Sequence, residues 1–323
     1  MAFPAHIFQA LPPFLGGKRR LTALIFAILH DLVPLPEWPT LTFLDPMCGG
    51  GAVALASKAM GFDVTASDSS QRGATIAHAL IANSTTRLAQ HDVLRLLNRV
   101  NTSDDHELND YDLLSLLFAE AANSHGPLRY LLELVLIKAY LKSFPMSLPS
   151  ATDAQAFQLG DFDRISPHRL ITYMKARKLL TPGRLLREAE LVNNGVFGGQ
   201  GTAMQGDALE LIQSVPADIV YLDPPYAGTT GYSQSYQALD RLLDDSVESQ
   251  PPSLASLLEA ADRIPLVILS YGGPGVTAES VAEIVSRHRT VIRSLDVPYP
   301  HLASIATEKR KSKTREVLII AER

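Results

Sequence analysis

Cysteine is almost absent from this chain, and its scarcity limits how the fold can be held together. Cys48 is the single cysteine among 323 residues, so no internal disulfide can form. The histidines are scattered and form no pair at the spacing of zinc ligands, and we therefore assign no metal site. Disulfide-stabilised scaffolds and structural zinc folds are excluded as classes.

Long apolar runs are missing as well. No stretch reaches the ~18 apolar residues of a membrane-spanning helix, and residues 1–18 lack the charged and apolar segments of a secretory signal. We therefore expect a cytoplasmic protein with no membrane partner, which we take to be a monomer. The net charge of −5 indicates no overall attraction to polyanions, although a local basic face is enough to bind nucleic acid.

What the sequence does contain is an alternation of strand-like and helix-like segments at both ends. Residues 41–45 and 62–67 are apolar, strand-like runs, separated by three glycines and the helix-like run 52–60. Strand, glycine turn, helix and strand make a βαβ unit. Further strand-like runs lie at 218–223, 267–271, 291–297 and 316–321. We predict an α/β fold with a doubly wound, Rossmann-like sheet.

The middle of the chain has a different pattern. Between about 85 and 199 the apolar residues recur at helical spacing, interrupted by polar stretches such as 101–110. We therefore predict a core made of residues 1–84 and 200–323, with 85–199 as a mostly helical insertion.

Three glycines follow the first strand-like run. Glycines 49–51 let a ligand approach the backbone closely, and the helix that follows offers free N–H groups at its N-terminus. The spacing Gly49-x-Gly51-x-x-Ala54, with Asp68 seventeen residues after Gly51, also fits the dinucleotide fingerprint. The turn therefore predicts a cofactor site, and taken alone it leaves a nicotinamide-dependent oxidoreductase open.

A second motif follows the strand-like run 218–223. Asp223, Pro224, Pro225 and Tyr226 stand where open α/β sheets bind ligands, at a strand's carboxyl end. An exocyclic amine on a base is a poor nucleophile, and two acceptors on its N–H bonds would raise the electron density on nitrogen. The Asp223 carboxylate and the Pro224 carbonyl can supply them, while Tyr226 can stack on the base.

Together these motifs carry a resemblance. The chain resembles the D12 class of DNA-adenine-methylase-like N6-adenine methyltransferases over residues of about 14 to 90 and 200 to 321. The residues that carry it, in the family's order, are Gly16-Gly17-Lys18, Asp45-Pro46 with glycines 49–51, Asp68, Gly206-Asp207 and Asp223-Pro224-Pro225-Tyr226.

The resemblance implies a class I methyltransferase core with S-adenosylmethionine as methyl donor and Asp223 against the target amine. By position, Gly17, Lys18 and the glycine turn would lie at the cofactor's methionine end, and Asp68 would hold its ribose hydroxyls. The cofactor residues implied are Gly17, Lys18, Asp45, Met47, Gly49, Gly51 and Asp68, with Asp207 and Ala208 beside the adenine.

The expected substrate is an adenine flipped out of duplex DNA, with a restriction endonuclease as a candidate partner. Residues 166–188 are helix-like and rich in basic residues, and 309–315 form a second basic run. Lys and Arg supply much of the affinity for DNA through its phosphates, although a solvated helix face has the same composition. The residues selected as nucleic-acid contacts are Arg169, Lys175, Arg177, Lys178 and Arg184.

Two alternatives remain open beside the oxidoreductase. Met47 stands where the resembled family usually has phenylalanine, and Asp45-Pro46-Met47-Cys48-Gly49 is reminiscent of RNA guanine methyltransferases. An RNA methyltransferase acting on adenine N6 or guanine N2 is therefore the nearest rival. The other is a nucleic-acid-binding protein without turnover, which the intact run 223–226 disfavours.

Overall fold

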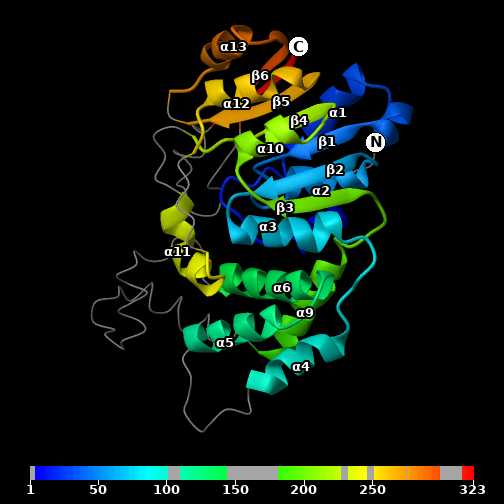
Figure 1. Ribbon diagram of the computed structural model, residues 1–323, viewed down its shortest axis with the longest axis vertical. Coiled ribbons are helices and arrows are strands. Elements are labelled where there is room, and N and C mark those ends of the chain that lie inside the picture. The colour runs from blue at the N-terminus through cyan, green and yellow to red at the C-terminus, as the bar shows by residue number, and fades with distance from the viewer. Residues whose placement is uncertain are drawn as a thin grey trace.

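A single mixed sheet, covered by helices, organises the chain (Figure 1). The computed structural model describes residues 4–100, 110–143, 181–226, 232–245, 251–273, 275–298 and 315–323. The strands are β1 Thr42–Asp45, β2 Asp63–Asp68, β3 Gly201–Gln205, β4 Ile219–Leu222, β5 Leu266–Gly272, β6 Thr290–Pro298 and β7 Arg315–Glu322.

The described helices alternate with these strands and fill the middle of the chain. They are α1 Thr22–Leu32, α2 Ala52–Ala59, α3 Gln71–Ala77, α4 Gln90–Val100, α5 Asp110–Ala122, α6 Pro127–Ser143, α9 Pro182–Asn193, α10 Ala208–Ser214, α11 Tyr232–Leu242, α12 Leu254–Ala260 and α13 Ala278–Ser286. Short helical turns are η1 Ala5–Ala10, η2 Leu35–Thr40, η3 His78–Ala82 and η6 Ala261–Arg263.

The strand order confirms the predicted fold class. The sheet runs β3-β2-β1-β4-β5-β7-β6. Strand β1 pairs in parallel with both β2 and β4, whereas β7 is antiparallel to β5 and β6. The chain therefore winds outward in two directions from β1 and β4, which is the doubly wound arrangement. The two strand-like runs that bear the predicted motifs are direct neighbours, with Phe43 opposite Ile219.

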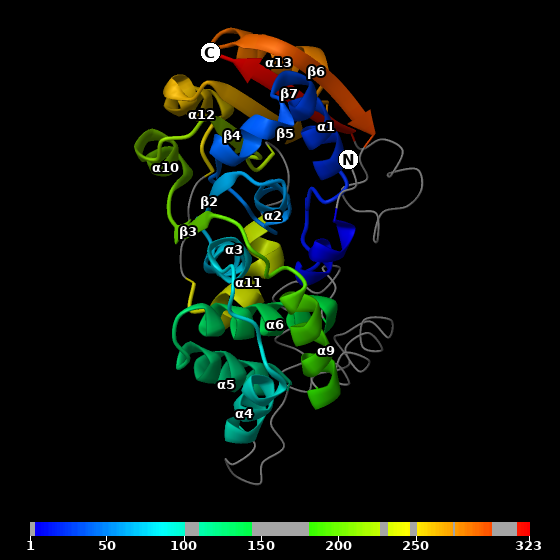
Figure 2. The same cartoon turned by 90° about the vertical axis from the view of Figure 1, so that its right-hand side faces the viewer.

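Both faces of the sheet are buried, which explains why its central strands are apolar without interruption. In β4, Ile219 and Tyr221 belong to one hydrophobic cluster, and Val220 and Leu222 belong to another. Figure 2 shows α10 and α12 on one side of the sheet and α1 and α2 on the other.

One strand was missed by the sequence analysis. Strand β3 lies at the edge of the sheet, where β2 is its one partner among the described strands. Its sequence GTAMQ contains just two apolar side chains, those of Ala203 and Met204. Gly201 is required there, because a Cβ would lie 2.6 Å from the Ile81 carbonyl oxygen. An edge strand without a repeating apolar pattern gives little signal in the sequence.

Helices α1 and α9 each begin after a short non-helical segment. Helix α1 begins at Thr22, after a turn at residues 18–21 in which the Leu21 N–H donates to the Lys18 carbonyl. In the helix-like stretch 166–188, residues 166–180 lie outside the described residues, and helix α9 begins at Pro182. Proline is favoured at the first position of a helix, where no N–H is needed.

Helices α4, α5, α6 and α9 pack together beside α3, at the lower end of Figure 1. Their apolar side chains belong to the same hydrophobic cluster as those of α1 and α2. The helical segment therefore shares its core with the sheet, and the division at residues 84 and 200 stays a prediction.

Candidate functional site

The two predicted motifs lie side by side at one edge of the sheet. Asp45 is the last residue of β1, and Asp223 follows the last residue of β4. From these neighbours the chain crosses in opposite directions, to β2 on one side and β5 on the other. A crevice forms beyond the strand ends at such a switch point, and ligands of open α/β sheets bind there.

The glycine turn adopts the backbone form that its sequence predicts. Gly49 has φ of 50° and Gly51 has φ of 72°, values that side chains other than glycine rarely adopt. A Cβ at Gly50 would lie 2.8 Å from the Phe14 Cβ. The turn thus brings bare backbone against Phe14 and leads into α2 through Gly51.

Asp68 is tied to the glycine turn. Its Oδ2 accepts a hydrogen bond of 2.8 Å from the Gly49 N–H, while its Oδ1 accepts from the Ser70 N–H and hydroxyl at 2.9 and 2.6 Å. A carboxylate has about four acceptor positions, so a further partner can be accommodated. The predicted contact with ribose hydroxyls stays a prediction, and the structure adds a local role in fixing the turn.

Asp45 is a buried acid at the carboxyl end of β1. Only 1% of its surface is exposed, and among the described residues its Oδ1 has no hydrogen-bond partner. Burial raises the pKa of Asp45 well above its usual value, and the nearby Asp223 and Asp68 carboxylates add to the rise. A buried acid with an open oxygen is suited to a polar or cationic ligand group.

Lys18 contacts two residues of the predicted motif 223–226 directly. Its Nζ lies 2.8 Å from Asp223 Oδ1, donates to the Tyr226 hydroxyl at 2.8 Å and to the Gly16 carbonyl at 3.0 Å. Only 4% of Lys18 is exposed. The sequence analysis placed this lysine at the cofactor's methionine end, and the structure shows it bound to Asp223.

Tyr226 makes contacts through both its hydroxyl and its ring. Its hydroxyl lies 2.5 Å from Glu316 Oε1 and 3.4 Å from Asp223 Oδ1, and its ring packs edge-on against Tyr271 at a centroid distance of 5.6 Å. Burial first, and then Asp223 and Glu316, raise the pKa of Tyr226 well above its usual value. Because only 8% of Tyr226 is exposed, the predicted stacking on a base stays a prediction.

Several other predicted site residues differ in burial. Pro224 is buried whereas Pro225 is exposed, and Met47 is half-buried against the second hydrophobic cluster. Asp207 caps α10, accepting from the Leu209 and Glu210 N–H groups at 2.9 and 3.2 Å, with Ala208 buried beneath it. Asp207 therefore has a structural role beside its predicted place near the cofactor adenine.

Helix α11 packs against the segment before Lys18, and sequence reasoning missed this contact. Tyr236 stacks on Phe14 at 5.0 Å and accepts from the Leu15 N–H at 2.8 Å. The Arg72 guanidinium lies 4.3 Å from the Tyr236 ring centroid and pairs with Asp240. These residues belong to segments far apart in sequence, and no local motif marks them.

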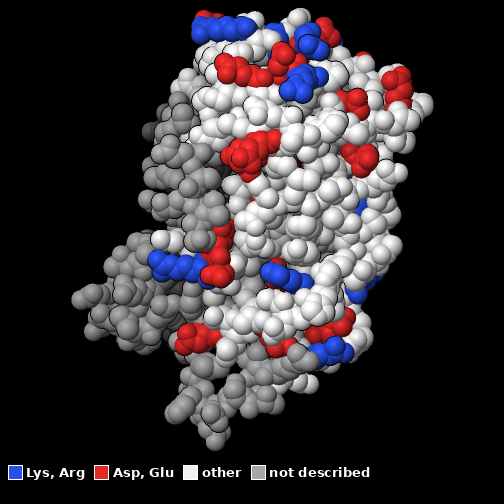
Figure 3. Space-filling model, in the orientation of Figure 1, with Lys and Arg blue, Asp and Glu red and all other residues white. Residues whose placement is uncertain are grey.

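Of the predicted nucleic-acid contacts, the structure describes one. Arg184 is exposed near the start of α9, whereas Arg169, Lys175, Arg177 and Lys178 lie outside the described residues. On the face seen in Figure 3, basic and acidic side chains are interspersed.

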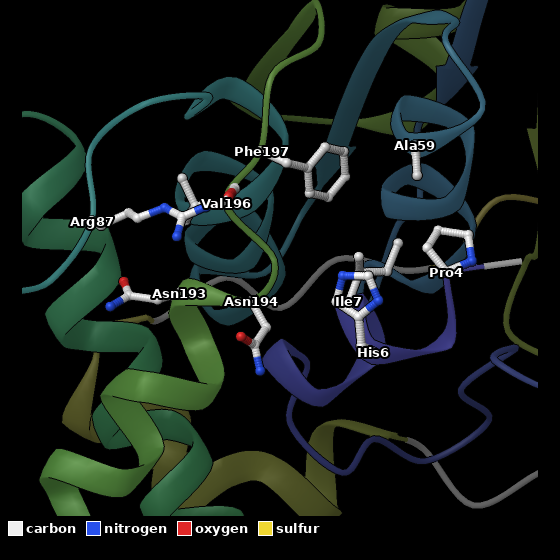
Figure 4. A pocket seen from close by; sticks show the side chains of 9 residues that line it. All are labelled: Pro4, His6, Ile7, Ala59, Arg87, Asn193, Asn194, Val196 and Phe197. Carbon is white, nitrogen blue, oxygen red and sulfur yellow. Dashed lines mark hydrogen bonds between the residues drawn. The ribbon is translucent and has the colours of Figure 1, made fainter.

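A separate hollow of about 470 Å³ lies elsewhere (Figure 4). It includes Ala59, the last residue of α2, whereas the glycine turn lies at the start of that helix. Two of its polar side chains already bind backbone, Arg87 to the Val196 carbonyl and Asn193 to Leu88. The hollow is therefore distinct from the crevice at the strand ends.

The described residues contain no group of three or more His, Cys, Asp or Glu side chains placed to hold a metal ion. Among the described helices, none combines the length and apolar character needed to cross a membrane.

The sheet order, the antiparallel β7 and the glycine turn after β1 define a core of the class I methyltransferase type. In sequence, the chain is similar to the type II methyltransferase M2.HphI of Haemophilus parahaemolyticus, with 24% identity over 309 residues that cover 87% of this chain and 90% of that one. This similarity supports a methyltransferase. No protein-family profile matches the chain.

A solved structure from Streptococcus mutans, described as that of an S-adenosylmethionine-dependent methyltransferase, matches with a TM-score of 0.35 and 12% identity. The match covers 89% of this chain but only 47% of the other, so this chain spans about half its length. At this TM-score the match carries no argument about function.

Proposed function

We propose that this protein transfers the methyl group of S-adenosylmethionine to the N6 amine of adenine in duplex DNA, as the D12 class does. The observation that carries the proposal is the pairing of β1 with β4, because the glycine turn follows the first of these strands and Asp223 follows the second. A carboxylate beside a cofactor turn is what an amine methyltransferase needs. The similarity to a type II methyltransferase supports the same conclusion.

The residues present fit the cofactor. S-adenosylmethionine is a cation at sulfur, and when bound it supplies an electrophilic methyl whose bond to sulfur breaks with the electron pair left on sulfur. Among the described residues, Asp45 has a buried carboxyl oxygen without a hydrogen-bond partner, and the Gly49–Gly51 turn packs against Phe14 with left-handed backbone at Gly49 and Gly51. Asp68 lies against the same turn and has acceptor capacity for hydroxyls.

Asp223 and Pro224 would act on the target amine. Asp223 is half-buried, with one oxygen fixed by Lys18, so its orientation is set before a substrate arrives. Acceptance of one amine hydrogen by Asp223 and of the other by the Pro224 carbonyl directs the nitrogen lone pair toward the methyl carbon. The amine nitrogen gains the methyl group and releases one proton, first to Asp223 and then to water. Such orientation is worth roughly 7 to 11 kcal/mol.

The target base would leave the duplex stack, because an amine inside a duplex is out of reach. Among the described residues, Arg184, which is exposed on α9, is our candidate for a phosphate contact. A restriction endonuclease remains a proposed partner, and the recognition sequence is set by side chains that reach the groove.

Methyl transfer to separate nucleic-acid pools tests the proposal. The chain is incubated with labelled S-adenosylmethionine and either mixed-sequence duplex DNA or structured RNA, and the products are digested to nucleosides. Label in N6-methyl-2′-deoxyadenosine from DNA, and none in the nucleosides from RNA, is expected. Label from RNA alone would favour the RNA methyltransferase, and calorimetric binding of NAD without binding of S-adenosylmethionine would support the oxidoreductase instead.

A further inference from the structure

Glu316 is a buried acid that belongs to none of the recognised motifs. It lies at the start of β7, opposite Gly272 of β5, and is 0% exposed. The residues that follow it in β7 are apolar, so the sequence shows only an acid at the head of a buried strand. A fully buried carboxylate is costly unless charged or polar groups compensate it.

The groups that compensate Glu316 are those that hold Asp223. Its Oε1 lies 2.5 Å from the Tyr226 hydroxyl and 3.4 Å from Lys18 Nζ. The same ammonium lies 2.8 Å from Asp223 Oδ1, and the same hydroxyl lies 3.4 Å from that oxygen. Glu316 is thus linked to Asp223 through two groups, Lys18 Nζ and the Tyr226 hydroxyl, which also contact each other at 2.8 Å.

The strand beside Glu316 leaves room for this arrangement. A Cβ at Gly272 would lie 3.0 Å from Tyr226 Cε2, 3.1 Å from Glu316 Oε2 and 3.2 Å from the Arg315 carbonyl oxygen. Each distance is tighter than an ordinary van der Waals contact. A side chain at position 272 would therefore press on the Tyr226–Glu316 contact from the neighbouring strand.

Building on the proposed methyl transfer, we propose that Glu316 is a positioning residue for Asp223. Glu316 fixes the Tyr226 hydroxyl and shares the Lys18 ammonium, so that neither donor is committed to Asp223 alone. The Asp223 carboxylate then keeps its orientation together with acceptor capacity for the amine hydrogen. The effect is transmitted through Tyr226 and Lys18 and requires no contact between Glu316 and either substrate.

A double-mutant cycle tests this role. Glu316→Gln and Tyr226→Phe are made singly and together, and each variant is assayed for its dissociation constant for S-adenosylmethionine and for kcat on duplex DNA. Glu316→Gln is expected to lower kcat by about 10- to 100-fold, the usual range for a hydrogen bond to a charged group, with the dissociation constant within about two-fold of wild type. In the Tyr226→Phe background the same change should cost far less, because one of the two routes is already broken.

The matched control is Glu322→Gln, an exposed acid at the far end of β7, which should leave kcat unchanged. Wild-type kcat in Glu316→Gln, an equal loss in both backgrounds, or a loss confined to cofactor affinity would each overturn the proposal. If Glu316→Gln does not fold, Gly272→Ala replaces it, with a lower kcat expected and a wild-type kcat contradicting the idea. An inactive wild-type protein would instead refute the proposed methyl transfer.

Discussion

The buried lysines of this protein differ in what they bind. Lys18, at the carboxyl end of the sheet, lies against the Asp223 and Glu316 carboxylates. Lys58 instead donates to the carbonyls of Leu80, Ile81 and Asn83 at 3.0, 2.8 and 2.8 Å. Both lysines are at least nine-tenths buried, so burial of a charge does not by itself mark a functional site.

Lys138 is intermediate between Lys58 and Lys18. It donates to the carbonyls of Gln9 and Ala10, at the end of η1, and lies 3.5 Å from Glu188. Lys58 and Lys138 therefore satisfy carbonyl groups that a helix end leaves without partners. Lys18 differs from both in lying against two carboxylates, whereas Lys138 has one and the hydrogen bonds of Lys58 go to carbonyls.

The largest effect is expected from Lys18→Met. This change removes the cation that Asp223 and Glu316 share and leaves two close carboxylates without it. Loss of one partner from a buried ion pair costs about 3–5 kcal/mol, so the free energy of unfolding should fall by that order. Denaturant titration measures the loss, and methyl transfer should be lost with it. A change below about 1 kcal/mol would show that the lysine is not the counter-ion we describe.

Lys58→Met sharpens the comparison, because it makes the same substitution as Lys18→Met at a buried lysine that binds backbone carbonyls. The three carbonyls that Lys58 binds lose their donor, which should lower the free energy of unfolding by about 1–3 kcal/mol. The value of kcat should stay at that of wild type in a methyl-transfer assay at a temperature where the variant is folded. A kcat loss comparable to that of Lys18→Met would contradict the distinction.

Asp68→Ala tests whether Asp68, which accepts hydrogen bonds from the Gly49 and Ser70 N–H groups, also binds the cofactor. The change releases the Gly49 N–H and Ser70, and should weaken binding of S-adenosylmethionine by about 10-fold, as judged by calorimetry. Asp92→Ala is the matched control, since Asp92 accepts from the Ala89 N–H at 2.8 Å at the start of α4. Equal affinity in the two variants would remove Asp68 from the cofactor site.

The smallest effect concerns pH. Burial lowers the pKa of both Lys58 and Lys138 from 10.5 to about 8. Below pH 8 both are charged and the cost of burying that charge is fully present; as the pH rises through 8 the folded protein loses these protons before the unfolded chain does, and the cost is relieved. Between pH 8 and about 9.5, below the ordinary tyrosine pKa, the free energy of unfolding should therefore rise with pH. Chemical denaturation across this range measures it, and Lys58→Met should reduce the rise without abolishing it, because Lys138 still loses its proton there. A fall with pH in wild type would contradict the sign.

Much of the sheet could be predicted from sequence because its central strands are short apolar runs ended by glycine or proline. The runs at 41–45 and 218–223 predict β1 and β4 in this way. Strand β3 could not be found, since an edge strand needs no continuous apolar pattern. Its existence follows from pairing with β2, which is a tertiary contact.

The site was predictable only where its residues form local motifs. The glycine turn and the run 223–226 carry their chemistry in adjacent residues. Glu316 and Tyr236 reach the site through strand pairing and helix packing, and their neighbours in sequence are not their neighbours in space. Lys18 was predicted to lie at the cofactor's methionine end, which stays a prediction, and its pairing with Asp223 was not predicted because the two residues are far apart in sequence.

The most direct test of the account is the Asp223→Ala variant, assayed for two properties in the same preparation. Calorimetry measures binding of S-adenosylmethionine, and labelled methyl transfer to duplex DNA measures turnover. The account predicts a dissociation constant close to that of wild type and a turnover lower by about 100-fold or more, because Asp223 acts on the amine and the glycine turn holds the cofactor. Wild-type turnover in this variant would contradict the central claim.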